Sequence, residues 1–309
     1  MSLQARSDAL HRLGVCGAAL LASLLLPCPA AAGKPTPRPA QAATAERGGA
    51  AALPQQVQQG QLVVARTDPR SEIRVGGRTI RADADGRYVF GVGRDEPSPL
   101  SIVIRTSGGG VEQHELEVVQ REYKIEKVDG LPQHTVTPDP ELARRIAEQQ
   151  ARVAKARERD DARNDYLLGF VRPAQGRISG VYGSQRIDNG VPKAPHYGLD
   201  IAVPTGTPVK APADGVVSFA DSSLILTGGT VLIDHGRGLS SSFLHLSHID
   251  VKVGDRVEQG EVFAAAGATG RASGPHVHWG FNWFDVRLDP ALLPEPAATR
   301  PRKADRPRG

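Results

Sequence analysis

The sequence predicts a mainly β protein in which two globular β parts are joined by one charged helix. Of the 309 residues, 34 are Gly and 24 are Pro, and these two types favour turns over helices. Short apolar runs recur between residues 60 and 125, and a single stretch, 139–165, has the composition of a helix. Short strands at regular spacing, with few helices, predict antiparallel β structure.

Residues 1–32 have the three-part layout of a secretory signal peptide. Arg6 and Arg12 come first, an apolar run extends from Leu13 to Leu26, and Pro29–Ala32 offers small residues for cleavage after Ala32. The apolar run is shorter than the stretch of about 20 residues that spans a membrane, which disfavours an uncleaved anchor. We therefore expect an exported protein that resides in the periplasm, on the cell wall or outside the cell.

The two cysteines, Cys16 and Cys28, both lie inside this leader. A lipid anchor on Cys28 is disfavoured because Pro27 stands where a small residue should precede a lipidated cysteine. The mature chain then contains no cysteine. Disulfides cannot stabilise it, and a cysteine protease mechanism is excluded.

Two segments follow the leader. Residues 33–59 are rich in Ala, Pro, Gln and Gly and predict a disordered tether. Residues 60–125 predict a small antiparallel β-sandwich, for which a wall-binding role and a plain spacer role both stay open. Its expected strands are the runs Gln61–Val64, Ser71–Val75, Arg87–Phe90, Leu100–Ile104 and Leu116–Val119.

Residues 126–172 predict a linker with one charged helix. Asp139 is suited to cap it and Pro140 to be its first residue, with the helix continuing to about Asp165. Its apolar residues form only a thin stripe, so we expect it to be exposed or docked on a neighbouring part. A helix beside a substrate groove could limit access to that groove.

Residues 173–290 contain four histidines and one aspartate whose spacing is typical of a zinc site. A catalytic zinc ion needs three protein ligands and an open position for water. His196, Asp200 and one histidine of the pair His276 and His278 would fill the three places. His245 and the other histidine of the pair could then transfer protons or stabilise an oxyanion.

The spacing of these residues fits extended chain. Side chains alternate across a strand, so His276 and His278 point to one face, and His196 and Asp200 also share a side. A helix over His196–Asp200 is disfavoured because Pro195 precedes it and Gly198 lies inside it. The spacing alone leaves open which of His276 and His278 binds the metal.

Three segments of this part resemble the zinc endopeptidases of the lysostaphin and LytM type. They are PHYGLDIAVPTGTPVKAPADGVV, SSFLHLSHIDVKVGDRVEQG and GATGRASGPHVHWG, and the resemblance extends over residues 173–290. It implies an antiparallel β catalytic domain with zinc at the floor of a groove. It further implies that His196, Asp200 and His278 bind the metal and that His245 and His276 are catalytic.

The same resemblance implies a zinc-dependent endopeptidase that hydrolyses peptide cross-links of bacterial peptidoglycan. Water activated by the ion would attack the scissile carbonyl with the help of the two catalytic histidines. The alternative is a non-catalytic regulator that activates cell-wall amidases, since some members of this family have lost their ligands. Here every ligand and both catalytic histidines are present, which favours the enzyme.

The charge pattern says little about chemistry. The formal net charge is +4, and most of the excess lies in the Pro-rich tail, residues 291–309, which we expect to be disordered. Such a tail could associate with an anionic envelope surface. No aromatic-rich basic strand or recognition helix accompanies it, so we expect no nucleic-acid partner. The expected partners are peptidoglycan stem peptides and cross-links, together with envelope regulators.

Overall fold

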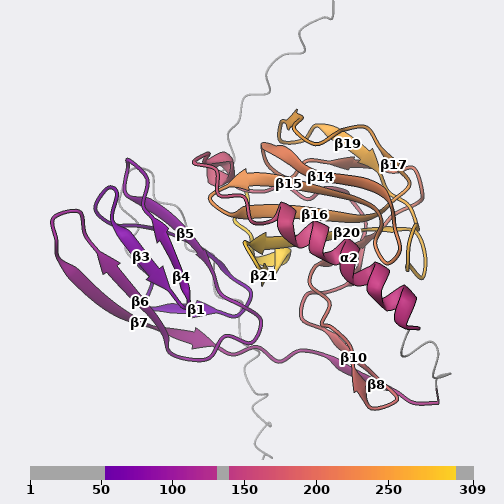
Figure 1. Ribbon diagram of the computed structural model, residues 1–309, viewed down its shortest axis with the longest axis horizontal. Coiled ribbons are helices and arrows are strands. Elements are labelled where there is room, and N and C mark those ends of the chain that lie inside the picture. Colours follow the sequence, from indigo (N-terminus) through magenta and orange to yellow (C-terminus); the bar gives the residue numbers. More distant parts are fainter. Residues whose placement is uncertain (1–52, 131–138, 297–309) are drawn as a thin grey trace, which may run out of the picture. The chain divides into compact units, whose positions relative to one another are not determined.

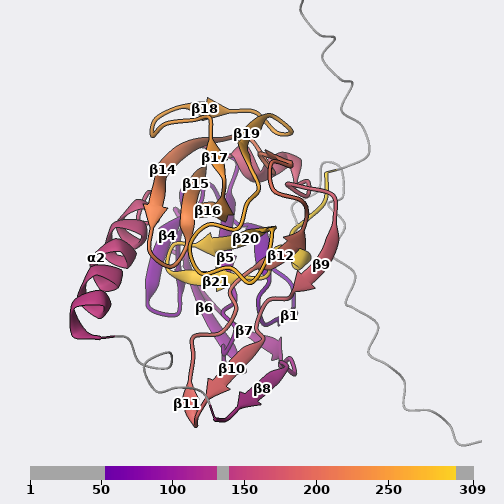
Figure 2. The same ribbon diagram turned by 90° about the vertical axis from the view of Figure 1, so that its right-hand side faces the viewer.

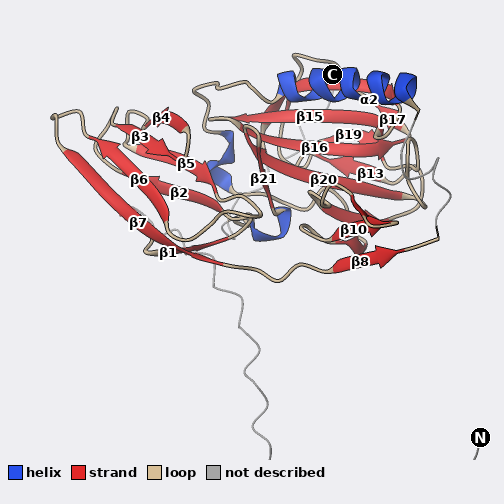
Figure 3. Cartoon of the chain, turned by 60° about the horizontal axis from the view of Figure 1, so that its bottom comes forward, coloured by secondary structure: helices blue, strands red, loops and turns tan. Residues whose placement is uncertain are grey.

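The computed structural model describes residues 53–130 and 139–296. The expected leader, most of the expected tether and the basic end of the tail lie outside the described residues. Within the described ranges, no helix is both long and apolar enough to cross a membrane. Strands dominate these ranges, as the sequence predicted (Figures 1 and 3).

The strands before residue 120 form two sheets. One has the order β1-β7-β6-β3-β4, and the other pairs β2 with β5. Each of the five predicted runs forms a strand, although the boundaries shift by a few residues. The bounds are β1 (Gln56–Gln58), β2 (Leu62–Arg66), β3 (Glu72–Val75), β4 (Arg78–Arg81), β5 (Arg87–Gly91), β6 (Leu100–Arg105) and β7 (Val111–Val119).

Two of these strands were not expected from the sequence. Strand β1 lies in the stretch predicted to be a tether, and it pairs in parallel with β7 while burying Val57. Strand β4 has the sequence Arg-Thr-Ile-Arg, in which Ile80 is the single large apolar residue, so no apolar run marks it. It forms a strand because the turn at Gly76 folds the chain back onto β3, and the pairing begins with Val75 opposite Arg78.

The predicted helix is present as α2 (Pro140–Ala156), and the Asp139 side chain caps it by accepting a hydrogen bond from the Leu142 amide at 2.9 Å. It ends about nine residues before the expected Asp165. Beyond it, Arg159 and Arg163 form ion pairs with the buried Asp234 of the large sheet. These contacts hold the chain in a non-helical path that composition alone does not reveal.

The remaining strands build the part of the chain that carries the histidines. The large antiparallel sheet has the order β18-β14-β15-β16-β20-β12-β9, with β21 also paired to β20 (Figure 2). Two further sheets have three strands each, in the orders β11-β10-β8 and β13-β19-β17. The bounds in the large sheet are β9 (Arg177–Gly180), β12 (Leu199–Ala202), β14 (Gly215–Leu224), β15 (Gly228–Gly236), β16 (Leu239–Leu246), β18 (Arg256–Val257), β20 (His276–Trp283) and β21 (Val286–Leu288). Those in the small sheets are β8 (Ile125–Val128), β10 (Gln185–Asp188), β11 (Val191–Pro192), β13 (Pro208–Lys210), β17 (His248–Ile249) and β19 (Val262–Ala265).

The two faces of the large sheet have different roles. Residues of one face, such as Ile201, Val231 and Val277, are fully buried in the main hydrophobic core. Because side chains alternate along a strand, Asp200 and His278 point to the opposite face. Leu232 shares that opposite face, where it forms a small apolar cluster with Phe219 and Leu224.

Helix α2 lies on the same face as the histidines but over different strands. Its Val153 and Ala156 pack against the small cluster of Phe219, Leu224 and Leu232, and Arg152 pairs with Asp221 at 2.7 Å. These contacts place the helix along β14 (Figures 1 and 2). Strand β16 separates β15 from β20 in the sheet, so α2 flanks the histidine strands and does not contact them through this cluster.

Candidate metal centre

Strand pairing brings the predicted ligands together. In the antiparallel pair of β12 and β20, Asp200 lies directly opposite His278, so that both side chains rise from adjacent points on one face. His196 precedes β12 and is held there by two backbone hydrogen bonds, from its own amide to Ser184 O at 2.7 Å and from the Gly183 amide to its carbonyl at 2.8 Å. Residues some 80 positions apart in the chain therefore meet in one place.

Three ligand atoms converge on a common point. His196 Nε2 lies 3.0 Å from both Asp200 Oδ1 and His278 Nδ1, and His278 Nδ1 lies 2.8 Å from Asp200 Oδ1. In a tetrahedral zinc site with bonds of about 2.1 Å, neighbouring ligand atoms are about 3.4 Å apart. The observed triangle is close to that size. Two imidazoles and one carboxylate also form the donor set that Zn²⁺ accepts, with one position left for water or substrate, so these residues fit the ion.

Two glycines give the ligands the room they occupy. A Cβ on Gly198 would lie 2.5 Å from His278 Nε2, and a Cβ on Gly180 would lie 2.2 Å from Asp200 Oδ2. Either contact is far closer than atoms tolerate. From the sequence Gly198 is recognisable only as a helix breaker, and Gly180 has no signal at all, because the need for a missing side chain arises only when β9, β12 and β20 are paired.

A backbone carbonyl orients the candidate ligand His196. Its Nδ1 lies 2.9 Å from Val181 O, and since a carbonyl can only accept, Nδ1 carries the proton. Nε2 is then left with its lone pair directed at Asp200 and His278. Hydrogen bonds of this kind fix the tautomer of metal-binding histidines in proteins.

The other two predicted histidines face the same point. His276 Nε2 lies 3.8 Å from Asp200 Oδ1, and the ring centroids of His245 and His276 are 4.8 Å apart. His245 Nδ1 lies 2.8 Å from Thr269 O, and His276 Nδ1 lies 2.8 Å from Gly274 O. Both rings therefore carry the proton on Nδ1 and have a free lone pair on Nε2.

The direction of the His245 side chain depends on an uncommon backbone conformation. Leu244 pairs with His278 and lies on the metal face, so regular alternation would turn His245 toward the core. His245 instead has φ +65°, in the left-handed region that side chains other than glycine seldom adopt. Its amide donates to Thr227 O at 2.8 Å, and the ring comes within 6.5 Å of the His278 ring centroid. The strain at this residue accompanies the placement of its ring beside the ligands.

Burial and charge set the protonation of the cluster. Burial lowers the pKa of His278 to about 4, although its hydrogen bond to Asp200 acts in the opposite direction. Burial also lowers the pKa of His245, against a hydrogen bond to Thr269 that raises it. For Asp200, burial raises the pKa, but the hydrogen bonds and charges of His196 and His278 outweigh it and hold the pKa well below its usual range. For His196, burial lowers the pKa, but the hydrogen bond and charge of Asp200 outweigh it and raise the pKa. Neutral imidazoles beside an ionised carboxylate are the forms that bind a metal ion, so an ion bound here would displace the proton that His196 otherwise gains.

Another histidine and three aromatic side chains of this region have structural places. His235 is fully buried, with Nδ1 2.7 Å from Asp214 O and Nε2 2.9 Å from Ser241 Oγ. Trp279, Trp283 and Phe284 belong to the main hydrophobic core and do not line a groove at the metal site.

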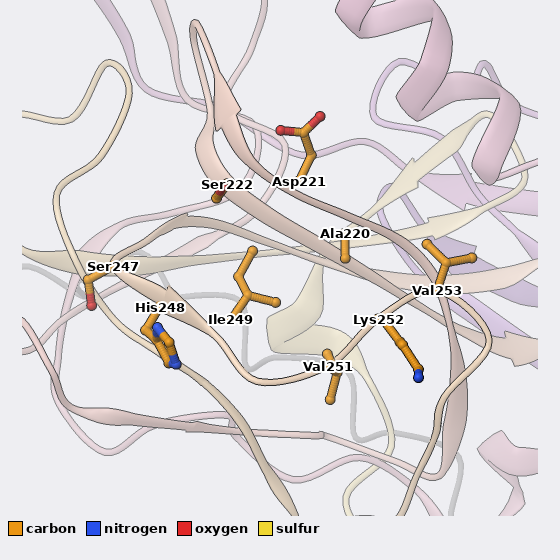
Figure 4. Close-up of a pocket in the computed structure, with 9 residues that line it drawn as sticks. All are labelled: Ala220, Asp221, Ser222, Ser247, His248, Ile249, Val251, Lys252 and Val253. Carbon is orange, nitrogen blue, oxygen red and sulfur yellow. The ribbon is translucent and has the colours of Figure 1, made fainter.

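A separate surface depression of about 670 Å³ lies between β14 and residues 247–253 (Figure 4). Ala220, Ile249 and Val251 are among the residues that line it, and none of the five candidate site residues does. The depression is thus distinct from the metal centre.

The architecture and the clustered side chains are those of a mainly β protein with a candidate His-Asp-His metal centre. Residues 194–290 match the model of peptidase family M23. A crystal structure assigned to peptidase M23 from Pseudomonas aeruginosa is 32% identical, with a TM-score of 0.59, and the alignment covers 76% of this chain and 93% of that one. The chain belongs to peptidase family M23.

Two relatives from other bacteria match over shorter stretches. The cell division protein DipM of Caulobacter vibrioides is 32% identical over 171 residues, which are 54% of this chain and 26% of DipM. The peptidoglycan DD-endopeptidase ShyA of Vibrio cholerae is 40% identical over 104 residues, which are 33% of this chain and 24% of ShyA. The chain therefore spans about a quarter of the length of these relatives.

Proposed function

We propose that this chain is a zinc-dependent endopeptidase that cleaves peptide cross-links of bacterial peptidoglycan. Membership of family M23 supports a peptidase, and the similarity to ShyA supports peptidoglycan as the substrate class. One observation carries the proposal. Three ligand atoms lie within 3.0 Å of one another while two further imidazoles, with their Nδ1 protons bound to carbonyls, face the same point.

His196 Nε2, a carboxylate oxygen of Asp200 and His278 Nδ1 would hold the ion. When bound, Zn²⁺ supplies Lewis-acid chemistry, which polarises a carbonyl and lowers the pKa of water. Asp200 contributes the negative charge of the site, and its contacts with both imidazoles keep that charge close to the ion. Val181 O keeps His196 in the tautomer that binds.

His245 and His276 supply the proton chemistry. Hydrolysis needs one group to accept a proton from the attacking water and another to face the oxyanion that develops on the substrate. The lowered pKa of His245 keeps its Nε2 unprotonated at neutral pH, which favours it as the proton acceptor. His276 is then the group that faces the oxyanion, and it would have to carry a proton on Nε2 to donate a hydrogen bond to that oxygen, because its Nδ1 already donates to Gly274 O. No glutamate base of the H-E-x-x-H kind is present in the sequence, so histidine takes this role.

The substrate class implies a location. Peptidoglycan lies outside the inner membrane, so we propose that the protein acts in the cell envelope, in agreement with the signal-peptide pattern of residues 1–32. A non-catalytic regulator would have no need for two further histidines with fixed tautomers beside the three ligands.

The experiment that tests the proposed function is digestion of isolated sacculi by the zinc-loaded protein, followed by mass spectrometry of the soluble products. We expect fragments with hydrolysed peptide cross-links, no new glycan ends, and loss of activity on chelation that added zinc restores. If the sacculi stayed intact and the protein stimulated a purified amidase, we would conclude that the chain is a regulator and not an endopeptidase.

A further inference from the structure

The loop between β19 and β20 carries a threonine whose hydroxyl contacts two strands of the large sheet. Thr269 Oγ1 accepts a hydrogen bond from the Gly229 amide of β15 at 2.9 Å and donates one to Leu246 O of β16 at 2.8 Å. A hydroxyl has one proton and two lone pairs, so it can fill both roles at once. Gly229 and Leu246 lie directly opposite each other in the pairing of β15 and β16. One side chain therefore ties this loop to both strands at a single point.

The same threonine contacts His245 and its neighbour. Its carbonyl accepts the hydrogen bond from His245 Nδ1 at 2.8 Å, and its hydroxyl binds the carbonyl of Leu246, the residue that follows His245. A third hydrogen bond comes from the turn between β14 and β15, where Thr227 O accepts the His245 amide at 2.8 Å. Thr269 thus supplies two of these three hydrogen bonds, one through its backbone and one through its side chain.

His245 depends on such contacts because its backbone is strained. Its φ of +65° lies in the left-handed region, which costs a residue with a side chain about 1 to 3 kcal/mol. A residue keeps a conformation of this kind only while the surrounding structure fixes it. Loss of the contacts would let β16 return to the regular alternation that turns position 245 toward the core.

The backbone around Thr269 takes its path from packing against β15. Gly270, the next residue, has φ +69°, and a Cβ on it would lie 2.4 Å from the amide nitrogen of Gly228. A Cβ on Gly228 would in turn lie 2.2 Å from Thr269 Oγ1. The loop and the start of β15 are therefore in close contact, and the Thr269 hydroxyl lies at that contact. Its removal would take a hydrogen-bond partner from both Gly229 and Leu246, which are buried.

We propose that Thr269 is a positioning residue for His245. Its hydroxyl anchors the loop on β15 and β16, and its carbonyl then holds the His245 ring with the proton on Nδ1 and the lone pair on Nε2. This inference rests on the proposed function, because it concerns how the group that accepts the proton from water is held. Serine could take the place of threonine, since only the hydroxyl and the carbonyl are used, whereas valine has the shape but lacks the hydroxyl.

The test compares Thr269→Val with Thr269→Ser in the zinc-loaded full chain, with a purified cross-linked peptide dimer as substrate. We expect Thr269→Val to lower kcat about 10- to 100-fold, the scale of loss when a reacting group is misplaced by about 1 Å. KM and the zinc affinity, measured by competition with a chelator, should stay at the wild-type values, because these hydrogen bonds of Thr269 involve none of the three candidate ligands. Thr269→Ser should keep the wild-type kcat.

Nitrogen NMR of the same proteins with isotope-labelled histidine reports the tautomer of His245 without any turnover. At one fixed neutral pH, the ring should carry its proton on Nδ1 in wild type and in Thr269→Ser. In Thr269→Val it should exchange between the two tautomers, because Thr269 O no longer has a fixed position. The signals of His245 are identified by their absence from His245→Ala.

Thr106→Val is the matched control. Thr106 is also partly buried, and its hydroxyl accepts a hydrogen bond from the Gly110 amide at 3.0 Å in the turn between β6 and β7. Its loss should leave kcat and the His245 tautomer unchanged, and thermal unfolding of each variant establishes that it is folded. Thr269→Ala, which leaves room for a water molecule between the two strands, covers the case in which Thr269→Val does not fold. It should lower kcat by less than valine does.

The outcomes separate the two proposals. Wild-type kcat and an unchanged His245 tautomer in the folded valine or alanine variant would overturn the positioning role and leave the endopeptidase intact. A lower kcat with an unchanged tautomer, or an equal loss in Thr269→Ser, would also overturn the positioning role. If wild type cleaved no dimer while Thr269→Val still changed the tautomer, the positioning of His245 would be supported and the endopeptidase overturned.

Discussion

Replacing Gly198 by alanine tests whether the metal centre depends on the space beside His278. The added Cβ would lie 2.5 Å from His278 Nε2, whereas ordinary contact begins at 3.4 Å. It cannot move aside, because Trp279 O stands 2.6 Å from it on the neighbouring strand. The imidazole must therefore shift by about 0.9 Å, several times the tolerance of about 0.2 Å in metal–ligand distances.

We expect Gly198→Ala to weaken zinc binding by about 10- to 100-fold, or about 1.4 to 2.7 kcal/mol, which is the scale seen when ligand orientation is disturbed. Peptidase activity at limiting zinc should fall with it and recover in part at high zinc. Competition with a chromophoric chelator measures the affinity, and thermal unfolding of the metal-free protein measures the fold.

Gly274→Ala is the matched control. Gly274 lies two residues before His276, yet a Cβ there would meet nothing within 4 Å. This variant should bind zinc as wild type does. Wild-type zinc affinity in Gly198→Ala, or an equal loss in both variants, would refute the steric argument.

Three further predictions follow from the same geometry. His278→Ala should lose metal and activity together, as measured by metal analysis and sacculus digestion, whereas full turnover without His278 would exclude it as a ligand. His245→Ala should keep its zinc but lose about 10²- to 10⁴-fold in kcat, the usual contribution of a general base, and an unchanged kcat would remove it from the mechanism. Burial lowers the pKa of His235 from 6.5 to about 4, so the folded protein favours the neutral imidazole. The free energy of unfolding should therefore decrease by about 3 kcal/mol as the pH falls from 6.5 toward 4. Burial raises the pKa of Asp234 to about 6, so the titration of Asp234 changes the stability in the opposite direction over the same pH range. The quantity to measure is therefore the difference in unfolding free energy between wild type and His235→Asn. If the two curves of unfolding free energy against pH were parallel, the prediction would be wrong.

Much of the fold could be read from local patterns. Apolar runs between turns located β2, β3, β5, β6 and β7, and Asp139 with Pro140 located the start of α2, because each signal lies within a few residues of chain. Strands β1 and β4 were missed since neither has an apolar run, and both exist only through pairing with a partner strand. The early end of α2 likewise depends on Asp234, which lies far along the sequence.

Local sequence patterns specify which chemical groups the candidate site contains. The His-x-x-x-Asp and His-x-His spacings predict that each pair of side chains points to one face of a strand, because side chains alternate along a strand as a local property. His245 lies between these two motifs in the sequence. These patterns do not determine which ring nitrogens face the ion, because tautomers depend on the carbonyls of Val181, Thr269 and Gly274.

How those groups meet depends on strand pairing and on packing between distant segments. Asp200 and His278 become neighbours through strand register, and the left-handed backbone at His245 turns its ring toward the metal face against the alternation of β16. The room at Gly198 also arises from packing between distant segments. Such contacts leave no periodic or local trace in the sequence, because they are fixed by which strands pair and by where a helix ends.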